Sequence, residues 1–143
     1  MNFSYKYARP MVTTDIILFS GAKGRTELLL IKRLNSPYKD HWAFPGGFVD
    51  ENESLEAAAR RELLEETGIK EAKLIQFQAF GDFGRDPRGH CVSVVYYQFV
   101  DKNNLTLKAG DDAKEADWFS INNLPKLAFD HSKILKEAIN KLL

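Results

Sequence analysis

The segment from Ser54 to Thr67 limits the fold more than any other part of the chain. It consists largely of residues with high helix propensity, and it contains neither Gly nor Pro. Ser54 is a favourable N-cap residue, and Gly68 stands where a left-handed glycine ends many helices. The segment therefore predicts one helix with two defined ends, around which the rest of the chain must pack.

Three glutamates of this predicted helix lie on one side of it. With about 100° of rotation per residue, Glu65 and Glu66 fall within roughly 60° on either side of Glu62. Ala58 and Ala59 lie on or beside the same stripe, so this side faces protein or a cleft rather than bulk water. Like charges at this spacing repel, and they repel more strongly when partly desolvated. A cation should therefore compensate them.

The helix alone does not supply that cation. Arg61 stands one turn before Glu65 and balances its charge, whereas Glu62 and Glu66 have no cation at helical spacing. Oxygen ligands without a nearby His or Cys select a hard cation, so the pattern predicts Mg²⁺ or Mn²⁺ rather than Zn²⁺. Mg²⁺ usually leaves coordination positions open for water and substrate phosphates. The pattern therefore predicts a reaction at a phosphate group. The alternative is a solvated acidic face with intrahelical ion pairs.

The other elements are predicted from runs of apolar and β-branched residues and from turn residues. Strands are expected over Thr13–Ser20, Glu27–Leu34, Ala72–Phe83, Cys91–Val100 and Glu115–Ile121. The first two form a hairpin, and Asn35–Gly47 is expected to be a loop because prolines and glycines interrupt it. Apolar spacing over Asp130–Leu143 predicts an amphipathic helix. The chain is therefore expected to form a single α/β domain over residues 1–143.

The composition limits the classes of binding partner and the cellular compartment that we expect for this chain. Lys and Arg number 20 and so do Asp and Glu, which argues against a generally basic nucleic-acid surface. The apolar runs are too short to span a bilayer and the first residues lack a signal-peptide pattern, so no membrane is expected. A single cysteine, Cys91, cannot form an internal disulfide, which favours a reducing compartment and a cytoplasmic location.

The predicted helix lies inside a longer motif. From Gly47 to Ile69 the chain reads GFVDENESLEAAARRELLEETGI, which resembles the Nudix box. The residues at the defined positions of that box are Gly47, Glu53, Arg61, Glu62, Leu63, Glu65, Glu66, Gly68 and Ile69. The preceding WAFPG segment (42–46) and the later Trp118–Phe119 pair are also similar to Nudix hydrolases. The resemblance covers most of the chain and implies hydrolysis of a nucleoside diphosphate linked to another group.

The resemblance implies a metal site. Divalent ions would be bound by Glu62, Glu65, Glu66 and the backbone carbonyl of Gly46. Pro45 has no N–H to donate, and the paired glycines allow a backbone conformation that aims a carbonyl at a metal. A bound metal would lower the pKa of a water molecule and neutralise charge on the phosphoryl oxygens.

The resemblance also implies roles for residues around the metal. Glu53 matches the family position that orients Arg61, so this pair would support the metal ligands from behind. Family members differ in the position of the general base. Here Glu65, Glu62 and Glu115 are all candidates, and the sequence does not choose among them.

A fold and an assembly are implied as well. The family fold is an α/β/α sandwich, with a mixed β-sheet between the box helix and the C-terminal helix. Members similar to ADP-ribose hydrolases are often homodimers. The alternating aromatics Phe3, Tyr5 and Tyr7 suit an edge strand or a strand exchanged with a second copy, and they suit equally a cover for their own domain.

The substrate is suggested by a second stretch, FGDFGRDPRGHCVSVVYY, which ends at Tyr97. It is similar to ADP-ribose pyrophosphatases and to ADP-ribose-binding regulators with a Nudix-like domain. Arg85 and Arg88 would donate to phosphate or ribose oxygens, and Asp86 would accept from ribose hydroxyls. The alternative is a plain turn between strands with its arginines facing solvent. If the resemblance holds, ADP-ribose is cleaved to AMP and ribose 5-phosphate.

An aromatic residue should then stack on the adenine, and the candidates are Phe19, Phe48, Phe83 and Tyr97. Two other functions compete. One is a Nudix hydrolase that acts on oxidised nucleoside triphosphates or on another dinucleotide. The other is a module that senses ADP-ribose without cleaving it. The intact acidic positions and the short segment after Leu124, too short for a winged helix, count against the second.

Overall fold

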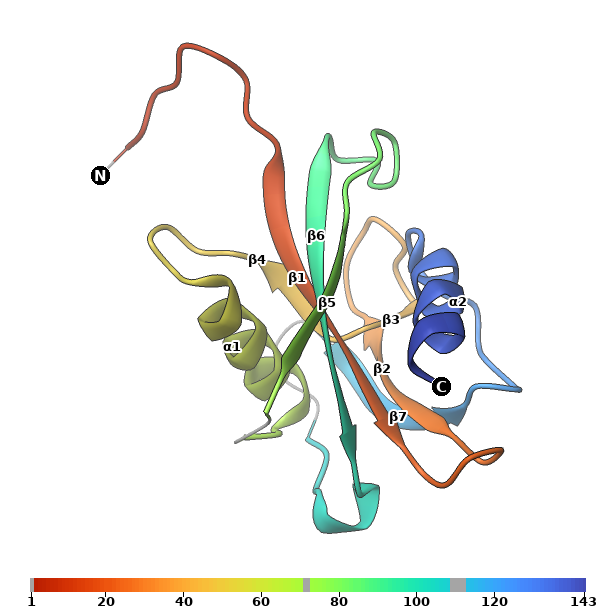
Figure 1. Ribbon diagram of the computed structural model, residues 1–143. Coiled ribbons are helices and arrows are strands. Elements are labelled where there is room, and N and C mark those ends of the chain that lie inside the picture. The colour runs from red at the N-terminus through yellow and green to blue at the C-terminus, as the bar shows by residue number, and fades with distance from the viewer. Residues whose placement is uncertain (1, 71–72, 109–112) are drawn as a thin grey trace.

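A computed structural model describes residues 2–70, 73–108 and 113–143 of the protein. Seven strands form one sheet, and two helices pack against its opposite sides (Figure 1). These helices are α1, Leu55–Thr67, and α2, His131–Leu142. The predicted α/β/α sandwich is therefore confirmed, with the box helix and the C-terminal helix as its outer layers.

The sheet is mixed. Its strands are β1 (Met11–Ser20), β2 (Glu27–Arg33), β3 (Trp42–Ala43), β4 (Gly46–Phe48), β5 (Ile75–Phe80), β6 (Cys91–Val100) and β7 (Ala113–Ser120). The order is β3-β2-β1-β6-β5, with β4 paired to β1 and β7 paired to β2. Among the strand pairs of the described residues, β1–β6 alone is parallel. A short 3₁₀ helix, Lys102–Asn104, follows β6.

Strand β1 contributes residues to the two larger hydrophobic cores. Its residues alternate between the two faces of the sheet, as the pleat of a strand requires. Ile16 and Leu18 belong to the core under α1, whereas Ile17 and Phe19 belong to the core under α2. All four are fully buried, which explains why this strand reads as a continuous apolar run.

Helix α1 begins and ends where its capping residues predict. The Ser54 hydroxyl accepts a hydrogen bond from the Ala57 N–H at 3.2 Å, and Gly68 adopts the left-handed conformation at φ 77°. Ala58, Ala59, Leu63 and Glu66 are buried residues of the helix. One glutamate of the acidic stripe is therefore buried together with the apolar residues.

Several predicted boundaries differ from the structure. The predicted loop Asn35–Gly47 contains β3 and the start of β4, which is wrong for those residues because their backbones pair with β2 and β1. Strand β5 begins at Ile75, later than predicted, and Ala72 lies outside the described residues. The strand predicted from Glu115 begins at Ala113.

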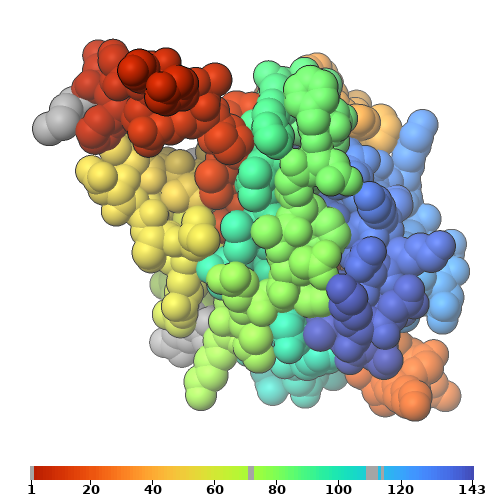
Figure 2. All heavy atoms as spheres, turned by 45° about the horizontal axis from the view of Figure 1, so that its top comes forward, coloured from red at the N-terminus to blue at the C-terminus, as the bar shows by residue number. Residues whose placement is uncertain are grey.

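The N-terminal aromatic segment neither joins the sheet nor covers the domain. Residues 2–10 contain no strand, and Phe3, Tyr5 and Tyr7 are 50%, 51% and 73% exposed. Figure 2 shows the segment in red at one corner of the molecule. The predicted edge strand and the predicted cover are therefore both wrong, while exchange with a second copy stays a prediction. Within the described residues, no helix is long and apolar enough to cross a membrane.

Candidate functional site

A cavity of about 350 Å³ opens between α1 and the N-terminal end of α2. Two of its walls carry opposite charge. Glu62 and Glu66 of α1 line one wall, next to Gly46, Gly47 and Phe48 of β4. The other wall contains the arginines Arg33, Arg85 and Arg88. We call these the acidic wall and the basic wall.

Close packing on the acidic wall explains the paired glycines. The buried Glu66 carboxylate accepts a hydrogen bond from the Gly46 N–H at 2.7 Å. A Cβ on Gly47 would lie 2.6 Å from the Glu62 carboxyl group and would displace that carboxylate. A Cβ on Gly46 would collide with the Thr14 carbonyl oxygen. Glycine is therefore required at position 46, where the β1 backbone approaches directly, and at position 47 it lets the Glu62 carboxylate keep its place.

Arg61 is the centre of the charge network on α1. Its guanidinium donates to Glu53 at 2.7 and 2.9 Å, to Glu62 at 2.8 Å and to Glu65 at 3.3 Å. It also donates to the Phe48 carbonyl at 3.0 Å. The hydrogen bond from Arg61 lowers the pKa of Glu53 to about 2, and the Glu53 contact raises the pKa of Arg61 despite burial. The predicted Glu53–Arg61 contact is therefore present.

The sequence argument about Glu62 is wrong in one respect. Helical spacing left Glu62 without a cation, yet Arg61 lies 2.8 Å from its carboxylate. Spacing rules consider neighbours three and four positions apart, whereas here adjacent side chains meet because Arg61 bends toward Glu53. Arg61 thus faces more than one carboxylate, which leaves the wall with an excess of negative charge.

The residue types of the acidic wall suit a hard divalent cation. Glu62, Glu66 and Gly46 line the same cavity and offer only oxygen ligands, the kind that Mg²⁺ and Mn²⁺ prefer. Glu65 does not line the cavity, and its half-exposed carboxylate lies on Arg61. Within the described residues, no three His, Cys, Asp or Glu side chains are grouped closely enough to share a metal ion, whereas Mg²⁺ is usually bound through one or two carboxylates.

The candidate general base Glu115 lies elsewhere. It is an exposed residue of β7, opposite Lys32 of β2, and it is absent from the residues that line this cavity. The structure therefore brings Glu62 to the cavity, whereas Glu65 binds Arg61 outside the lining and Glu115 lies on a separate strand.

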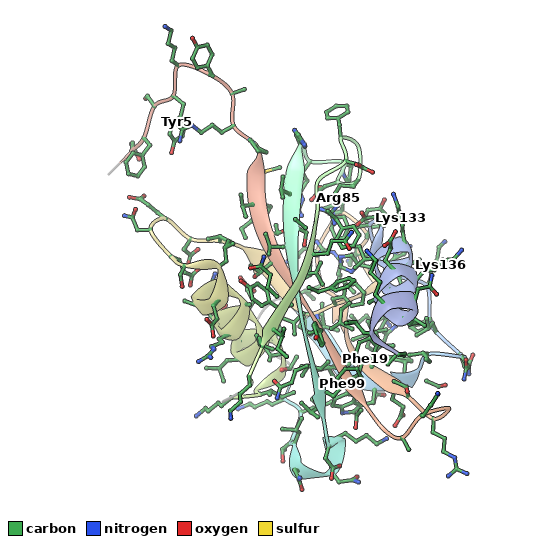
Figure 3. The ribbon with its side chains drawn as sticks, in the orientation of Figure 1. Tyr5, Phe19, Arg85, Phe99, Lys133 and Lys136 are labelled. Atoms are coloured by element: carbon green, nitrogen blue, oxygen red, sulfur yellow. The ribbon has the colours of Figure 1, made fainter. Side chains whose placement is uncertain are left out.

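The basic wall begins with a buried ion pair. Arg85 donates to Asp130 through two hydrogen bonds of 2.9 and 2.7 Å, and the Arg85 side chain is only 5% exposed. Burial opposes the charged form, but the bonds to Asp130 outweigh it and raise the pKa of Arg85. Figure 3 places Arg85 beside the N-terminal end of α2. Two of its five N–H donors are therefore used within the protein.

Arg88 is held by a second aspartate. It donates to Asp86 at 3.0 and 2.8 Å, and the buried Asp86 also accepts the Arg88 backbone N–H at 2.9 Å. Burial would raise the pKa of Asp86, but the Arg88 contacts lower it overall. The Arg88 guanidinium lies 4.7 Å from the Phe48 ring and 5.3 Å from the Phe129 ring. The alternative of a plain turn with solvent-facing arginines is therefore wrong for Arg85, whereas Arg88 is exposed but held by Asp86.

Arg33 was not found by sequence reasoning. It ends β2, lines the cavity and lies 4.9 Å from the Phe129 ring. Its Nε donates to the Pro37 carbonyl at 2.8 Å, and no salt bridge of Arg33 occurs within the described ranges. Burial and then the charge of Arg88 lower its pKa. No local motif marks Arg33, because Phe129 and Arg88, which lie near it in the cavity, come from distant segments.

The structure separates the four candidates for adenine stacking. Phe19 is fully buried and stacks on Phe99, as Figure 3 shows, so this candidate is wrong. Tyr97 packs edge-on against Phe99 within the core under α2. Phe83 is 84% exposed and does not line the cavity, whereas Phe48 does. Phe129, which sequence reasoning missed, lines the cavity as well.

Comparisons with known proteins agree with this architecture. A model of the NUDIX domain matches residues 9–138. The ADP-ribose pyrophosphatase of Methanocaldococcus jannaschii is 47% identical over 131 residues, which cover 92% of this chain and 74% of that protein. The ADPR responsive transcriptional repressor NtrR of Acinetobacter baylyi is 38% identical over 140 residues, which cover 95% of this chain and 56% of that protein.

A solved structure is similar over nearly the whole chain. The NUDIX domain of Shewanella oneidensis NrtR, crystallised with ADP ribose, has a TM-score of 0.89 at 29% identity. The match covers 99% of this chain and 95% of that one. On the family match and the 47% identity, the chain belongs to the Nudix family of pyrophosphohydrolases.

Proposed function

We propose that this enzyme hydrolyses ADP-ribose to AMP and ribose 5-phosphate with Mg²⁺ or Mn²⁺ as its cofactor. The observation that carries the proposal is a single cavity with carboxylates on one wall and guanidinium groups on the other. A diphosphate needs both, because a hard cation and arginines can neutralise its charge from two sides. The relative named as an ADP-ribose pyrophosphatase and the neighbour crystallised with ADP ribose support the substrate.

On the acidic wall, Glu62, Glu65, Glu66 and the Gly46 carbonyl would hold the metal. When bound, the metal supplies a water of lowered pKa and neutralises charge on the phosphoryl oxygens. Arg61 keeps the glutamates in place and limits their mutual repulsion. The side chain of Glu65 would have to leave Arg61 to join the other ligands.

On the basic wall, the arginines would have different tasks. Arg88 and Arg33 would bind phosphate or ribose oxygens, since both line the cavity and Arg33 has no salt bridge in the described part of the chain. Arg85 would mainly hold its loop against Asp130. Phe48 or Phe129 would stack on the adenine, because both rings line the cavity beside Arg88.

In the proposed reaction, water adds to one phosphorus and the bond from that phosphorus to the bridging oxygen breaks. The water gives up a proton to a carboxylate, and the two products leave as AMP and ribose 5-phosphate. We favour Glu62 as the acceptor of that proton, because it lines the cavity, whereas Glu65 and Glu115 do not. A general base must lie within reach of the proton that it accepts, so the position of a candidate is considered before its pKa.

A substrate panel tests the proposal. The protein is incubated with Mg²⁺ and, separately, ADP-ribose, an oxidised nucleoside triphosphate and a dinucleoside polyphosphate, and products are separated by anion-exchange chromatography. We expect AMP and ribose 5-phosphate from ADP-ribose in equal amounts, with slower turnover of the other two. Rapid turnover of the oxidised nucleotide with none of ADP-ribose would overturn the substrate.

The second candidate function is sensing of ADP-ribose without cleavage. It is favoured by the 38% identity to the ADPR responsive repressor, although the chain spans only about half of that protein. Calorimetric binding of ADP-ribose in the presence of Mg²⁺, without release of AMP over hours, would select it. Catalytic release of AMP would exclude it.

A further inference from the structure

The turn Phe44–Pro45–Gly46, which carries the proposed metal-binding carbonyl, is fixed by three different elements. The Gly46 N–H donates to Glu66 of α1 at 2.7 Å, and the Pro45 carbonyl accepts from the Ile16 N–H of β1 at 2.8 Å. The Phe44 N–H donates to Nδ1 of His131, the first residue of α2, at 3.1 Å. The third contact reaches across from the opposite helical layer of the sandwich.

The His131 ring is enclosed and oriented. It is 3% exposed, and it stacks on the Phe44 ring at 4.5 Å and 17° between planes. Because Nδ1 accepts a hydrogen bond, it carries no proton in this arrangement, and burial lowers the pKa of His131 in the same sense. Nε2 faces the Asp15 carboxylate at 3.9 Å, and that carboxylate accepts from Ser93. The ring thus has one defined orientation.

The residue before His131 holds the loop of the basic wall in place. Asp130 immediately precedes His131 and forms the two hydrogen bonds to Arg85. Two consecutive residues at the start of α2 therefore contact both a backbone of the acidic wall and a loop of the basic wall. His131 is buried in the lining of this charged cavity and binds a backbone N–H, which indicates a role through the backbone.

We propose that His131 is a positioning residue of the hydrolase site, which holds the Phe44–Pro45–Gly46 turn so that the Gly46 carbonyl and the Glu66 carboxylate keep their places on the acidic wall. The inference rests on the proposed function. Of the three anchors, Glu66 is itself a proposed metal ligand. His131 therefore supplies, together with Ile16, the anchoring that does not depend on how Glu66 is used.

A pair of matched variants tests this role. In His131→Asn the amide oxygen can take the place of Nδ1 and accept from Phe44, whereas in His131→Gln the amide reaches the position of Nε2 instead. Both are polar and both remove the ring. We expect Mn²⁺ affinity, measured by electron paramagnetic resonance without substrate, to be about 10-fold weaker in His131→Gln than in His131→Asn.

Two further measurements distinguish a role of His131 in positioning the turn from a general role in stabilising the fold. In the metal-free protein labelled with ¹⁵N-phenylalanine, amide hydrogen exchange at Phe44 should be faster in His131→Gln than in His131→Asn. In turnover of ADP-ribose, kcat should fall in His131→Gln while KM changes less than about threefold, since the basic wall still binds the substrate.

Several outcomes would overturn the proposal. Equal Mn²⁺ affinity and equal Phe44 exchange in the two variants would show that the acceptor at Nδ1 does not matter. A rise in KM with unchanged kcat would assign His131 to substrate binding instead. Wild-type protein that binds no Mn²⁺ would refute the proposed function and this role with it, whereas wild-type binding with identical variants refutes the role alone.

Discussion

The two walls of the cavity both pair arginine with carboxylates, but in opposite proportion. On α1 a single arginine, Arg61, contacts Asp50, Glu53, Glu62 and Glu65. On the other side, three arginines line the cavity, and of the two aspartates that bind Arg85 and Arg88 only Asp86 lines it with them. In a chain with a formal net charge of zero, charge is therefore separated locally.

This difference in charge indicates which ions each wall can bind. Excess carboxylate at a partly buried surface is stabilised by a cation, and excess guanidinium by an anion. A metal-bound diphosphate satisfies both walls at once, whereas either wall alone has the ordinary explanation of a surface ion-pair network. Perturbing one wall at a time should therefore change different quantities.

The largest effect is expected at Glu66. The change Glu66→Gln keeps an oxygen that can accept the Gly46 N–H but removes the charge. We expect kcat with Mg²⁺ to fall by more than about 100-fold, beyond the loss typical of residues behind a metal ligand. Steady-state kinetics measure it, and the thermal unfolding midpoint serves as the control. Unchanged kcat in a folded protein would refute the role of Glu66.

Arg61 should have the next largest effect. In Arg61→Lys a single ammonium group cannot reproduce the contacts to Glu53, Glu62 and the Phe48 carbonyl. We expect a loss of about 10- to 100-fold in apparent Mg²⁺ affinity, read from the Mg²⁺ dependence of turnover. Arg60→Lys is the matched control, because Arg60 makes an exposed ion pair with Glu56. Equal effects of both changes would argue against a special role for Arg61.

Substitutions of Arg88 and Arg85 in the basic wall should affect different properties, substrate binding in the first case and stability in the second. Arg88→Lys loses the planar fork and should raise KM for ADP-ribose about 10-fold, with little change in kcat. Arg85→Lys should instead lower the free energy of unfolding by about 2 kcal/mol, because one hydrogen bond of a buried charged pair is lost. Kinetics and urea denaturation of both variants measure this. The reverse assignment would mean that Arg85 binds the substrate.

The smallest effect is a pH dependence of stability at Glu53. Its folded-state pKa, about 2, lies below its ordinary value of 4.5, because Arg61 binds the charged form. The stabilisation is therefore complete above about pH 5 and is lost as pH falls toward 2. The difference in unfolding free energy between wild type and Glu53→Gln should shrink between pH 5 and pH 2. A difference independent of pH would contradict this.

The acidic wall was the more predictable half of the site. Its residues come from one short motif, so helical geometry and spacing bring Glu62 and Glu66 to one side. The ends of α1 followed from Ser54 and Gly68 because capping is local chemistry.

The other parts depend on contacts between distant segments. Strand β4 was missed because Gly46 and Gly47 read as a turn, while their pairing with Asp15 and Thr14 is long-range. Phe19 was proposed to stack on adenine because alternation along a strand does not say which side faces the cavity. His131 belongs to no local motif, and only the fold brings it to Phe44.

The central claim is that the acidic wall binds a hard divalent cation. Calorimetric titration with Mn²⁺, with a non-hydrolysable methylene analogue of ADP-ribose present, tests it most directly when wild type is compared with a Glu62→Gln, Glu66→Gln double variant. We predict saturable binding to the wild type and at least about 10-fold weaker binding to the double variant. No binding to the wild type, or equal affinity in both proteins, would contradict the claim.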